Sequence, residues 1–167
     1  MINSTAEKIK YVNGDATHPI GEGNKLIIHC CNNLGVWGKG FVLALSKRWR
    51  KPVIEYMKWY ESGHHFAGGR FELGAIQTVP VEKGIVICNM IGQNGIIAKD
   101  NPKPIRYDAI NTCLFKVFNL IQLDEEKYTV HAPRFGSGLA GGDWDLIEKL
   151  IEVNLTEKGI PVTIYDL

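Results

Sequence analysis

The chain has 167 residues, of which 45% are hydrophobic and 22% charged, a balance typical of a globular protein with one buried core. Its 19 Lys and Arg residues nearly equal its 18 Asp and Glu residues, so the basic excess typical of nucleic-acid-binding proteins is missing. No apolar run approaches the roughly 20 residues of a membrane-spanning helix, and the polar start lacks the apolar segment of a signal peptide. We therefore expect one cytoplasmic, monomeric domain over residues 1–167, with neither a membrane nor a nucleic acid as partner.

The cysteines do not form a pattern that metal binding or a disulfide framework would need. None belongs to a C-x-x-C pair, and most lie in apolar stretches: Cys30, Cys31, Cys88 and Cys113. Zinc sites and disulfide frameworks use closely spaced, repeated cysteines. We expect free thiols, no metal site and no bound cofactor.

Short apolar segments alternate with longer segments of helical periodicity. The sequence predicts strands at 8–13, 25–31, 73–80, 84–91, 128–132 and 161–167. It predicts helices over 40–49, from Pro52, from Pro104 and over 143–155. This alternation predicts the α/β class, as a three-layer α/β/α sandwich around a central mixed sheet. The segment 61–71, "ESGHHFAGGRF", is interpreted as a surface connection.

Two of the predicted helices carry clear apolar faces, and one strand is apolar almost throughout. The inward-facing residues of the helices are Ile110, Leu114, Val117 and Ile121, and then Trp144, Ile147, Ile151 and Leu155. Residues 25–31, "KLIIHCC", are typical of a strand buried on both faces.

Three loops follow predicted strands: "NNLGVWGKG" at 32–40, "GQNGII" at 92–97 and "FGSGLAGG" at 135–142. In α/β sheets, ligands bind at the carboxyl ends of the strands, where such loops lead into helices. The three loops are therefore the predicted walls of a binding site.

The third loop contains G-x-G-x-x-G, at Gly136, Gly138 and Gly141. A Rossmann dinucleotide site would need further strands after this motif, and too few residues follow it in this sequence. A glycine-rich turn beside a helix starting near Asp143 still favours a phosphate site, because backbone N–H groups and the helix dipole attract anions. A tight turn that needs positive φ angles is the alternative.

The loop "GVWGKG" at 35–40 is a second glycine-rich connection between a strand and a helix. It lacks the G-x-x-x-x-G-K-[ST] pattern of a P-loop, which argues against a nucleotide triphosphatase. Two glycine-rich loops flanking one cleft would suit a diphosphate.

Several segments together resemble the macrodomain family, whose members bind ADP-ribose. The resemblance covers essentially the whole chain and rests on "YVNGDAT", "IIHCCNNLGVWGKGF", "PRFGSGLAGGDW" and the terminal "VTIYDL". The chain is most similar to the branch with yeast-type ADP-ribose-1''-phosphate phosphatases and lysine-dependent ADP-ribosyl-glutamate hydrolases. The resemblance therefore implies ADP-ribose or its derivatives as partner.

The resemblance also implies roles for individual residues. Asp15 would accept a hydrogen bond from the adenine amino group, with the backbone of Ala16 beside it, and Tyr165 would pack near the adenine. Asn32 would face the distal ribose. The remaining ligand-binding candidates are Gly35, Val36, Trp37, Gly38, Lys39, Gly40 and Gln93, and then Gly136, Ser137, Gly138, Leu139, Ala140 and Gly141. For Asp15 and Asn32, a role in shaping turns is the alternative.

Two positions depart from the glutamate-hydrolysing branch. Gln93 stands where that branch has a lysine that forms a covalent intermediate, and Ala140 stands where it has an acid. Gln93 cannot form a Schiff base and Ala140 cannot act as acid or base. We therefore reject that mechanism and expect hydrolysis of ADP-ribose 1''-phosphate to ADP-ribose and phosphate.

The catalytic candidates are His29, Asn32 and Asp143, with Lys39 to neutralise phosphate charge. His29 could instead be a core histidine, and Asp143 could serve the dipole of its helix. Cys31 as a nucleophile is a weaker alternative. Three other functions stay open: a non-catalytic ADP-ribose reader, a deacylase of O-acyl-ADP-ribose or ADP-ribosylated protein, and an RNA- or nucleotide-binding module.

Overall fold

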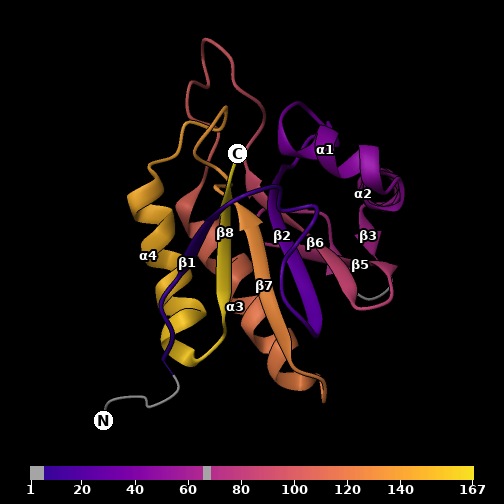
Figure 1. Ribbon diagram of the computed structural model, residues 1–167. Helices are drawn as coiled ribbons and strands as arrows, with labels where there is room; N and C mark the ends of the chain where they lie inside the picture. The colour runs from indigo at the N-terminus through magenta and orange to yellow at the C-terminus, as the bar shows by residue number, and fades with distance from the viewer. Residues whose placement is uncertain (1–5, 66–68) are drawn as a thin grey trace.

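The computed structural model describes residues 6–65 and 69–167, and it is built around a six-stranded sheet (Figure 1). The strands lie in the order β1, β8, β7, β2, β6, β5, and all neighbouring pairs are parallel except β5 with β6. Their bounds are β1 Lys10–Asn13, β2 Asn24–Asn32, β5 Ile76–Glu82, β6 Ile85–Gln93, β7 Tyr128–Pro133 and β8 Val162–Asp166. The predicted mixed sheet is confirmed, and its strand order differs from that of a Rossmann fold.

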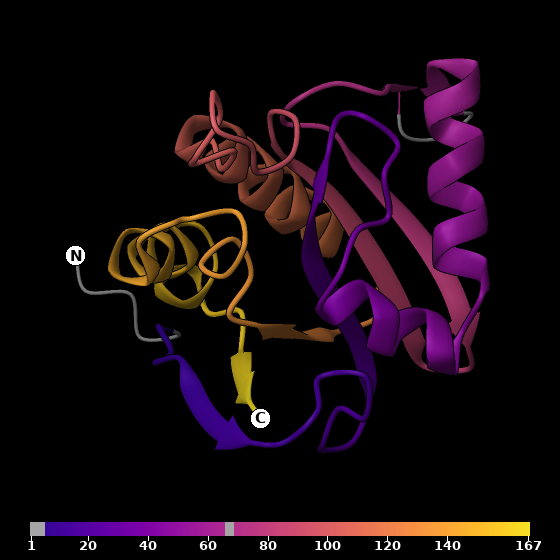
Figure 2. The same cartoon turned by 90° about the horizontal axis from the view of Figure 1, so that it is seen from above.

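Helices cover both faces of this sheet. Figure 2 shows α3 and α4 on one face and α1 and α2 on the other. Their bounds are α1 Phe41–Arg48, α2 Lys51–Ser62, α3 Tyr107–Leu123 and α4 Trp144–Asn154, followed by the 3-10 turn η1 Thr156–Lys158. The predicted three-layer α/β/α sandwich is confirmed. In the described part of the chain, no helix combines the length and apolar character that crossing a membrane would require.

The predicted start of the third helix at Pro104 is wrong, because α3 begins only at Tyr107. The carbonyl of Pro104 accepts a hydrogen bond from Asn94 N at 2.8 Å, and Ile105 forms a β-bridge with Gln93. These contacts hold residues 104–105 in an extended conformation beside the end of β6. The proline therefore closes the preceding loop and does not open the helix.

The predicted strand at 73–80 also begins later than expected, since pairing with β6 starts at Ile76. The segment 61–71 contributes a short hairpin of β3 His64–His65 and β4 Gly69–Arg70. Its residues 66–68 lie outside the described part of the chain. The other predicted strands and helices match the structure to within two residues at each end.

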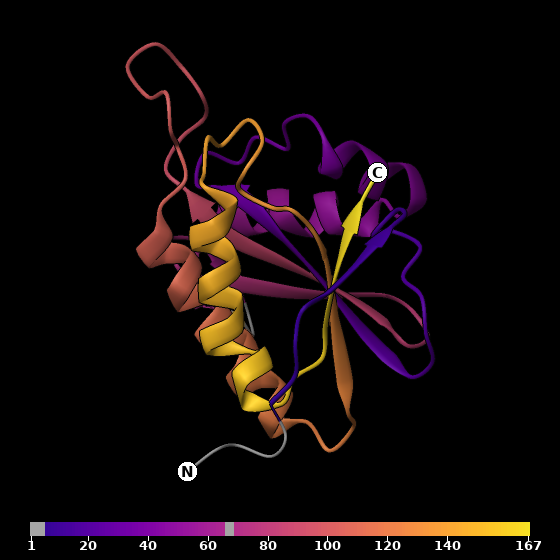
Figure 3. The same ribbon diagram turned by 60° about the vertical axis from the view of Figure 1, so that its left-hand side comes forward.

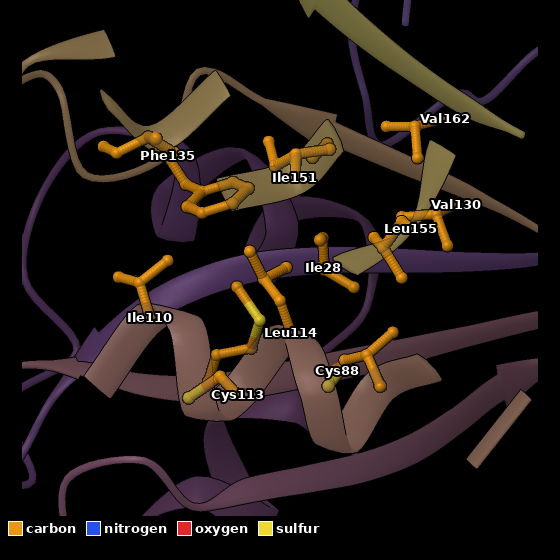
Figure 4. Close-up of a cluster of buried hydrophobic side chains, with 14 of the residues drawn as sticks. Ile28, Cys88, Ile110, Cys113, Leu114, Val130, Phe135, Ile151, Leu155 and Val162 are labelled. Atoms are coloured by element: carbon orange, nitrogen blue, oxygen red, sulfur yellow. The ribbon is translucent and has the colours of Figure 1, made fainter. Parts of the chain in front are cut away.

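The main core lies between the sheet and the pair α3 and α4 (Figure 4). The predicted face of α3 is buried throughout, and Ile110, Leu114 and Val117 have no exposed surface. Ile147, Ile151 and Leu155 from the second predicted face are equally buried, whereas Trp144 is half-buried. Strand β2 passes between this core and the aromatic residues under α1 and α2, which explains its apolar run.

The parallel pairing places the carboxyl ends of β1, β8, β7, β2 and β6 at one edge of the sheet. The three glycine-containing loops predicted as a binding site therefore lie at the same edge. Figure 3 shows the loop between β6 and α3 rising beyond the other two. The fold thus brings together segments that are about 100 residues apart in the chain, such as 32–40 and 135–142.

Replacing Leu114 by alanine should lower the free energy of unfolding by about 2–5 kcal/mol, because the side chain is fully enclosed. The matched control is Leu123→Ala on the same helix, where the leucine is 84% exposed and the loss should stay within about 0.5 kcal/mol. Chemical denaturation of both variants measures the difference. Equal losses would contradict the assignment of the α3 face.

Candidate functional site

A cleft lies where the carboxyl ends of the strands meet, and it has two lobes. The wide lobe, about 600 Å³, lies among the residues that follow β1, β2 and β7 and the end of β8. The narrow lobe, about 400 Å³, lies between the loops after β2 and β6. The two lobes belong to one cleft because they share lining residues: Cys30, Lys39, Val42, Gln93 and Leu139.

Most of the predicted ligand-binding and catalytic residues line this cleft. The wide lobe has Asp15, Ala16, His29, Lys39, Gly40, Gln93, Gly136, Gly138, Leu139, Ala140 and Tyr165. The narrow lobe adds Asn32, Val36, Trp37 and Gly38. Four predicted residues are not among the lining residues of either lobe: Gly35, Ser137, Gly141 and Asp143.

Asp15 shapes a turn and also faces the wide lobe. One carboxylate oxygen, Oδ1, accepts hydrogen bonds from Thr17 N at 2.9 Å and Thr17 Oγ1 at 2.8 Å. The other, Oδ2, lies 3.5 Å from His18 Nδ1. Burial raises the pKa of this carboxyl, but the hydrogen bonds from Thr17 and the nearby His18 outweigh it, and the pKa is lowered. The turn and an acceptor in the cleft are therefore compatible roles for one side chain.

Asn32 organises the loop that follows β2. Its Oδ1 accepts from Leu34 N at 2.9 Å, Val36 N at 3.2 Å and the hydroxyl of Tyr56 at 3.0 Å, while its Nδ2 donates to Val36 O at 2.6 Å. An oxygen that already accepts three hydrogen bonds is not available to orient a water. The structure therefore favours the loop-shaping alternative for Asn32 over the predicted catalytic role.

Trp37 and Gly35 hold the same loop against α1 and α2. Trp37 donates from Nε1 to Ser46 Oγ at 2.6 Å and to Val42 O at 3.0 Å, which ties the loop to α1. Gly35 has φ 72°, and a Cβ there would lie 2.4 Å from the ring of Tyr60. Gly35 thus contributes through close packing and does not line the cleft.

The opposite wall is the loop at 135–142, and close packing again explains its glycines. Gly142 N donates to Gly136 O at 2.8 Å, and a Cβ on Gly142 would lie 2.4 Å from that same oxygen. Gly136 has φ 76° and has no room for a Cβ beside Ile105. Ser137 turns away and donates to Arg134 O at 2.8 Å. The glycines therefore serve a tight turn whose backbone still faces the cleft.

The predicted anion site at the start of α4 is not at the cleft. Asp143 caps this helix, accepting from Asp145 N at 2.9 Å, so a carboxylate already lies at that N-terminus. The helix that points its N-terminus at the cleft is α1. Gly40, Phe41 and Val42 line the wide lobe there, and no side chain caps the helix. The helix dipole at the cleft is thus that of α1 and not, as predicted, that of α4, and Asp143 serves its own helix.

His29 is a core histidine with one edge at the cleft. It is 2% exposed, and its Nε2 lies 2.5 Å from Asn89 Oδ1. Burial lowers its pKa to about 4, although the hydrogen bond to Asn89 acts in the other direction. At neutral pH the imidazole is neutral and enclosed, which disfavours the predicted role as proton donor.

Tyr165 supports the turn that carries Asp15. Its hydroxyl accepts from Ile20 N at 2.9 Å and lies 2.8 Å from His131 Nδ1, and the residue is 4% exposed. A Cβ on Gly14 would lie 3.6 Å from the Tyr165 ring. Tyr165 therefore packs under the loop after β1, at the floor of the wide lobe.

Arg134 lines the wide lobe and was missed by the sequence reasoning. Its guanidinium forms a two-point ion pair with Asp166, with Nε 2.6 Å from Oδ1 and Nη2 3.0 Å from Oδ2. It also lies over the rings of Tyr11 at 4.9 Å and Trp144 at 5.4 Å. The only signal in the sequence was its place directly after a strand, within "PRFGSGLAGGDW".

Charge is unevenly distributed between the lobes. Asp15 and Asp166 line the wide lobe together with Arg134, and Lys39 reaches both lobes. Among the described residues that line the narrow lobe, none carries a carboxylate, and the single charge is that of Lys39. Gln93 and Ala140, the two departures from the lysine-dependent pattern, both lie in the cleft.

Comparison with known proteins places this geometry in a family. No family model matches the sequence. A macrodomain protein of Streptomyces coelicolor is 48% identical, with a TM-score of 0.81 over 96% of this chain and 99% of that one. A Bacteroides thetaiotaomicron protein of unknown function is 49% identical, with a TM-score of 0.88 over 96% and 98% of the two chains. The chain belongs to the macrodomain family.

Curated relatives include proteins of two different kinds. The chromodomain-helicase-DNA-binding protein 1-like proteins of Mus musculus and Danio rerio are both 32% identical over 94% of this chain. The chain spans only about a sixth of their length, 17% and 15% respectively. The ADP-ribose 1''-phosphate phosphatase of Candida albicans is 24% identical, over 86% of this chain and 92% of that protein.

Stability should fall on mild acidification because two buried histidines are neutral in the folded state. Burial lowers the pKa of both His29 and His131 to about 4, with Lys25 adding to the effect at His131. The unfolded chain takes up these protons below about pH 6.5, while the folded chain does not until about pH 4. The free energy of unfolding should therefore fall by up to about 1.4 kcal/mol per pH unit for each histidine.

Denaturation curves between pH 7 and 4.5 measure this slope. His131→Gln should lower the slope by the contribution of one histidine, up to about 1.4 kcal/mol per pH unit. His18→Gln is the matched control, because the His18 side chain is 67% exposed. A slope that is the same in all three proteins would contradict the assignment.

Proposed function

We propose that the cleft binds ADP-ribose, with the adenosine in the wide lobe, the diphosphate between the two glycine-rich loops and the distal ribose in the narrow lobe. The observation that carries this proposal is the pairing of two glycine-rich walls along one two-lobed cleft. A dinucleotide-like ligand has two ends of different chemistry joined by a diphosphate, and the cleft has the same division.

The centre of the cleft favours the diphosphate. The uncapped N-terminus of α1 at Gly40 and Phe41 offers backbone N–H groups and the positive end of the helix dipole. Lys39 lies at the junction of the lobes, and the backbone of Gly136 and Gly138 faces it from the other wall. These groups together supply the positive potential that a bound diphosphate requires at the centre of the cleft.

The wide lobe supports adenine recognition through Asp15. Its Oδ2 accepts no hydrogen bond from Thr17 and lies 3.5 Å from His18 Nδ1, so it can also accept from an adenine amino group. Relatives support the ligand class, since the Candida albicans relative is an ADP-ribose 1''-phosphate phosphatase and this chain covers 92% of it.

Asp15→Asn provides the sharpest test, because asparagine keeps an oxygen for the Thr17 turn and replaces the free acceptor by a donor. The wild-type protein should bind ADP-ribose about tenfold or more tightly than the analogue in which hypoxanthine replaces adenine. In Asp15→Asn this preference should disappear or reverse, as measured by calorimetric titration.

Asp124→Asn, at the end of α3, is the matched control and should bind like the wild type. Absence of heat and of a thermal shift with ADP-ribose in the wild type would refute the proposed ligand. Equal preference in Asp15→Asn and wild type would refute only the place of the adenine.

For the reaction, we propose removal of the terminal phosphate from ADP-ribose 1''-phosphate. Water would attack phosphorus, and the bond from phosphorus to the ribose oxygen would break, which releases ADP-ribose and inorganic phosphate. Lys39 would neutralise the developing charge, and Gln93 would orient the phosphate or the water. With no carboxylate among the described lining residues of the narrow lobe, we expect slow turnover.

Phosphate release from ADP-ribose 1''-phosphate measures this activity. Lys39→Met should lower the rate by about 10²-fold, because it removes the charge that stabilises the transition state. Lys47→Met is the matched control on α1 and should keep the wild-type rate. Tight binding of ADP-ribose without any release would mean that the protein is a non-catalytic reader.

A second reaction is favoured by the rim of the narrow lobe. Val36, Ile96, Ile97 and Leu139 line it and are 42–59% exposed, so the rim offers aliphatic surface to a substituent on the distal ribose. Such a surface suits the acyl group of O-acyl-ADP-ribose. Deacylation that is faster than phosphate release at equal substrate concentration would make this the main reaction.

A further inference from the structure

A row of buried polar side chains crosses three neighbouring strands beneath the cleft. His29 on β2 is in register with Asn89 on β6, and Asn89 is in register with Gln77 on β5. They are 2%, 0% and 1% exposed, respectively. Burying three polar side chains is unfavourable unless each one is hydrogen-bonded.

The row forms one continuous chain of hydrogen bonds that ends on α2. His29 Nε2 lies 2.5 Å from Asn89 Oδ1, and Asn89 Nδ2 donates to Gln77 Oε1 at 3.0 Å. Gln77 Nε2 donates to Glu55 O at 2.9 Å, and Asn89 Nδ2 also reaches Pro52 O at 3.3 Å. Because the Asn89 oxygen can only accept, Nε2 of His29 carries the proton, and the orientation of the imidazole is set from α2.

The other side of the imidazole contacts the glycine-rich loop at the cleft. The ring centroids of Trp37 and Phe41 both lie 5.6 Å from that of His29, with Trp37 edge-on at 82°. Trp37 belongs to the loop at 35–40, and Phe41 is the first residue of α1. Cys31 Sγ lies 3.9 Å from both ring nitrogens of His29. His29 is thus the point at which the buried hydrogen-bonded row contacts the wall of the site.

We propose that His29 is a positioning residue, which Asn89 and Gln77 orient and which holds Trp37 and Phe41 so that the loop at 35–40 and the start of α1 keep the shape that the diphosphate requires. Asn89 and Gln77 are not among the lining residues of either lobe, so they act on a ligand indirectly. One route is His29, and the other is α2, whose Tyr56 hydroxyl donates to Asn32. The effect of His29 on ligand binding rests on the proposed function. Its effect on the position of Trp37 does not depend on any ligand.

The ring and the hydrogen bond of His29 can be separated by two substitutions. His29→Phe keeps a ring between Trp37 and Phe41, and His29→Gln keeps a donor for Asn89 but removes the ring. We expect His29→Phe to retain ADP-ribose affinity within a few-fold and His29→Gln to weaken it by about tenfold. Phosphate release at saturating substrate should fall by no more than a few-fold in His29→Phe, with the pH profile of the wild type.

Trp37 itself gives a readout that needs no ligand. In protein labelled with 5-fluorotryptophan, the fluorine resonance of Trp37, assigned through Trp37→Phe, should shift or broaden in His29→Gln. Gln77→Met, which breaks the row without touching the cleft or His29, should produce a smaller change of the same kind. Gln122→Met on the exposed side of α3 is the matched control and should leave the resonance unchanged.

Two outcomes would overturn the proposal. Loss of phosphate release in His29→Phe with unchanged ADP-ribose affinity and Trp37 resonance would make His29 a catalytic residue. An unchanged Trp37 resonance in both His29→Gln and Gln77→Met would show that the row does not hold the loop. Failure of the wild-type protein to bind ADP-ribose would refute the proposed function. The Trp37 resonance would still decide whether His29 positions the loop.

Discussion

The pairing of β2 with β6 on one edge and β7 on the other is the constraint on which the rest of the structure depends. Both pairings are parallel, so the chain must cross over between strands, and the crossovers carry the helices that cover the sheet. The same parallel direction brings the carboxyl ends of the strands to one edge. The cleft therefore follows from strand direction, before any side chain in it is considered.

The walls of the cleft are ordered by contacts that point away from it. Asn32 and Trp37 hold the loop after β2 through its own backbone and through α1. Arg48 of α1 also donates to Thr17 O in the loop that carries Asp15, so one helix supports both the loop after β1 and the loop after β2. A site built in this way is preorganised, because the groups that face a ligand do not need to be ordered when it binds.

Charge and polarity divide the cleft in the same way as its shape does. The carboxylates and Arg134 gather in the wide lobe, Lys39 and the start of α1 lie at the centre, and aliphatic residues surround the narrow lobe. A buried polar row runs under the centre, from His29 through Asn89 to Gln77. This row fits a need for fixed geometry at the point where an anion would bind.

The sequence by itself determined the order of the strands and helices along the chain, the layers of the sandwich and the edge of the sheet at which the site lies. Those features depend on hydrophobic period, on glycine-rich connections and on strand direction, all of which are local or follow from simple topology. It also identified the two glycine-rich walls and the positions of Gln93 and Ala140. Pro104 misled the prediction because its neighbours pair with the end of β6, a contact invisible in local sequence.

Only the tertiary structure decided what the individual side chains are available to do. His29 is neutral because burial lowers the pKa of its imidazole, and its hydrogen-bond partner Asn89 lies 60 residues away in the chain. Asp143 caps its own helix, and the dipole near the cleft comes from α1 instead, which depends on where each helix starts in space. Arg134 reaches the site because Asp166, Tyr11 and Trp144 hold it there. Such roles depend on distances between remote residues, which hydrophobic pattern and motif spacing do not encode.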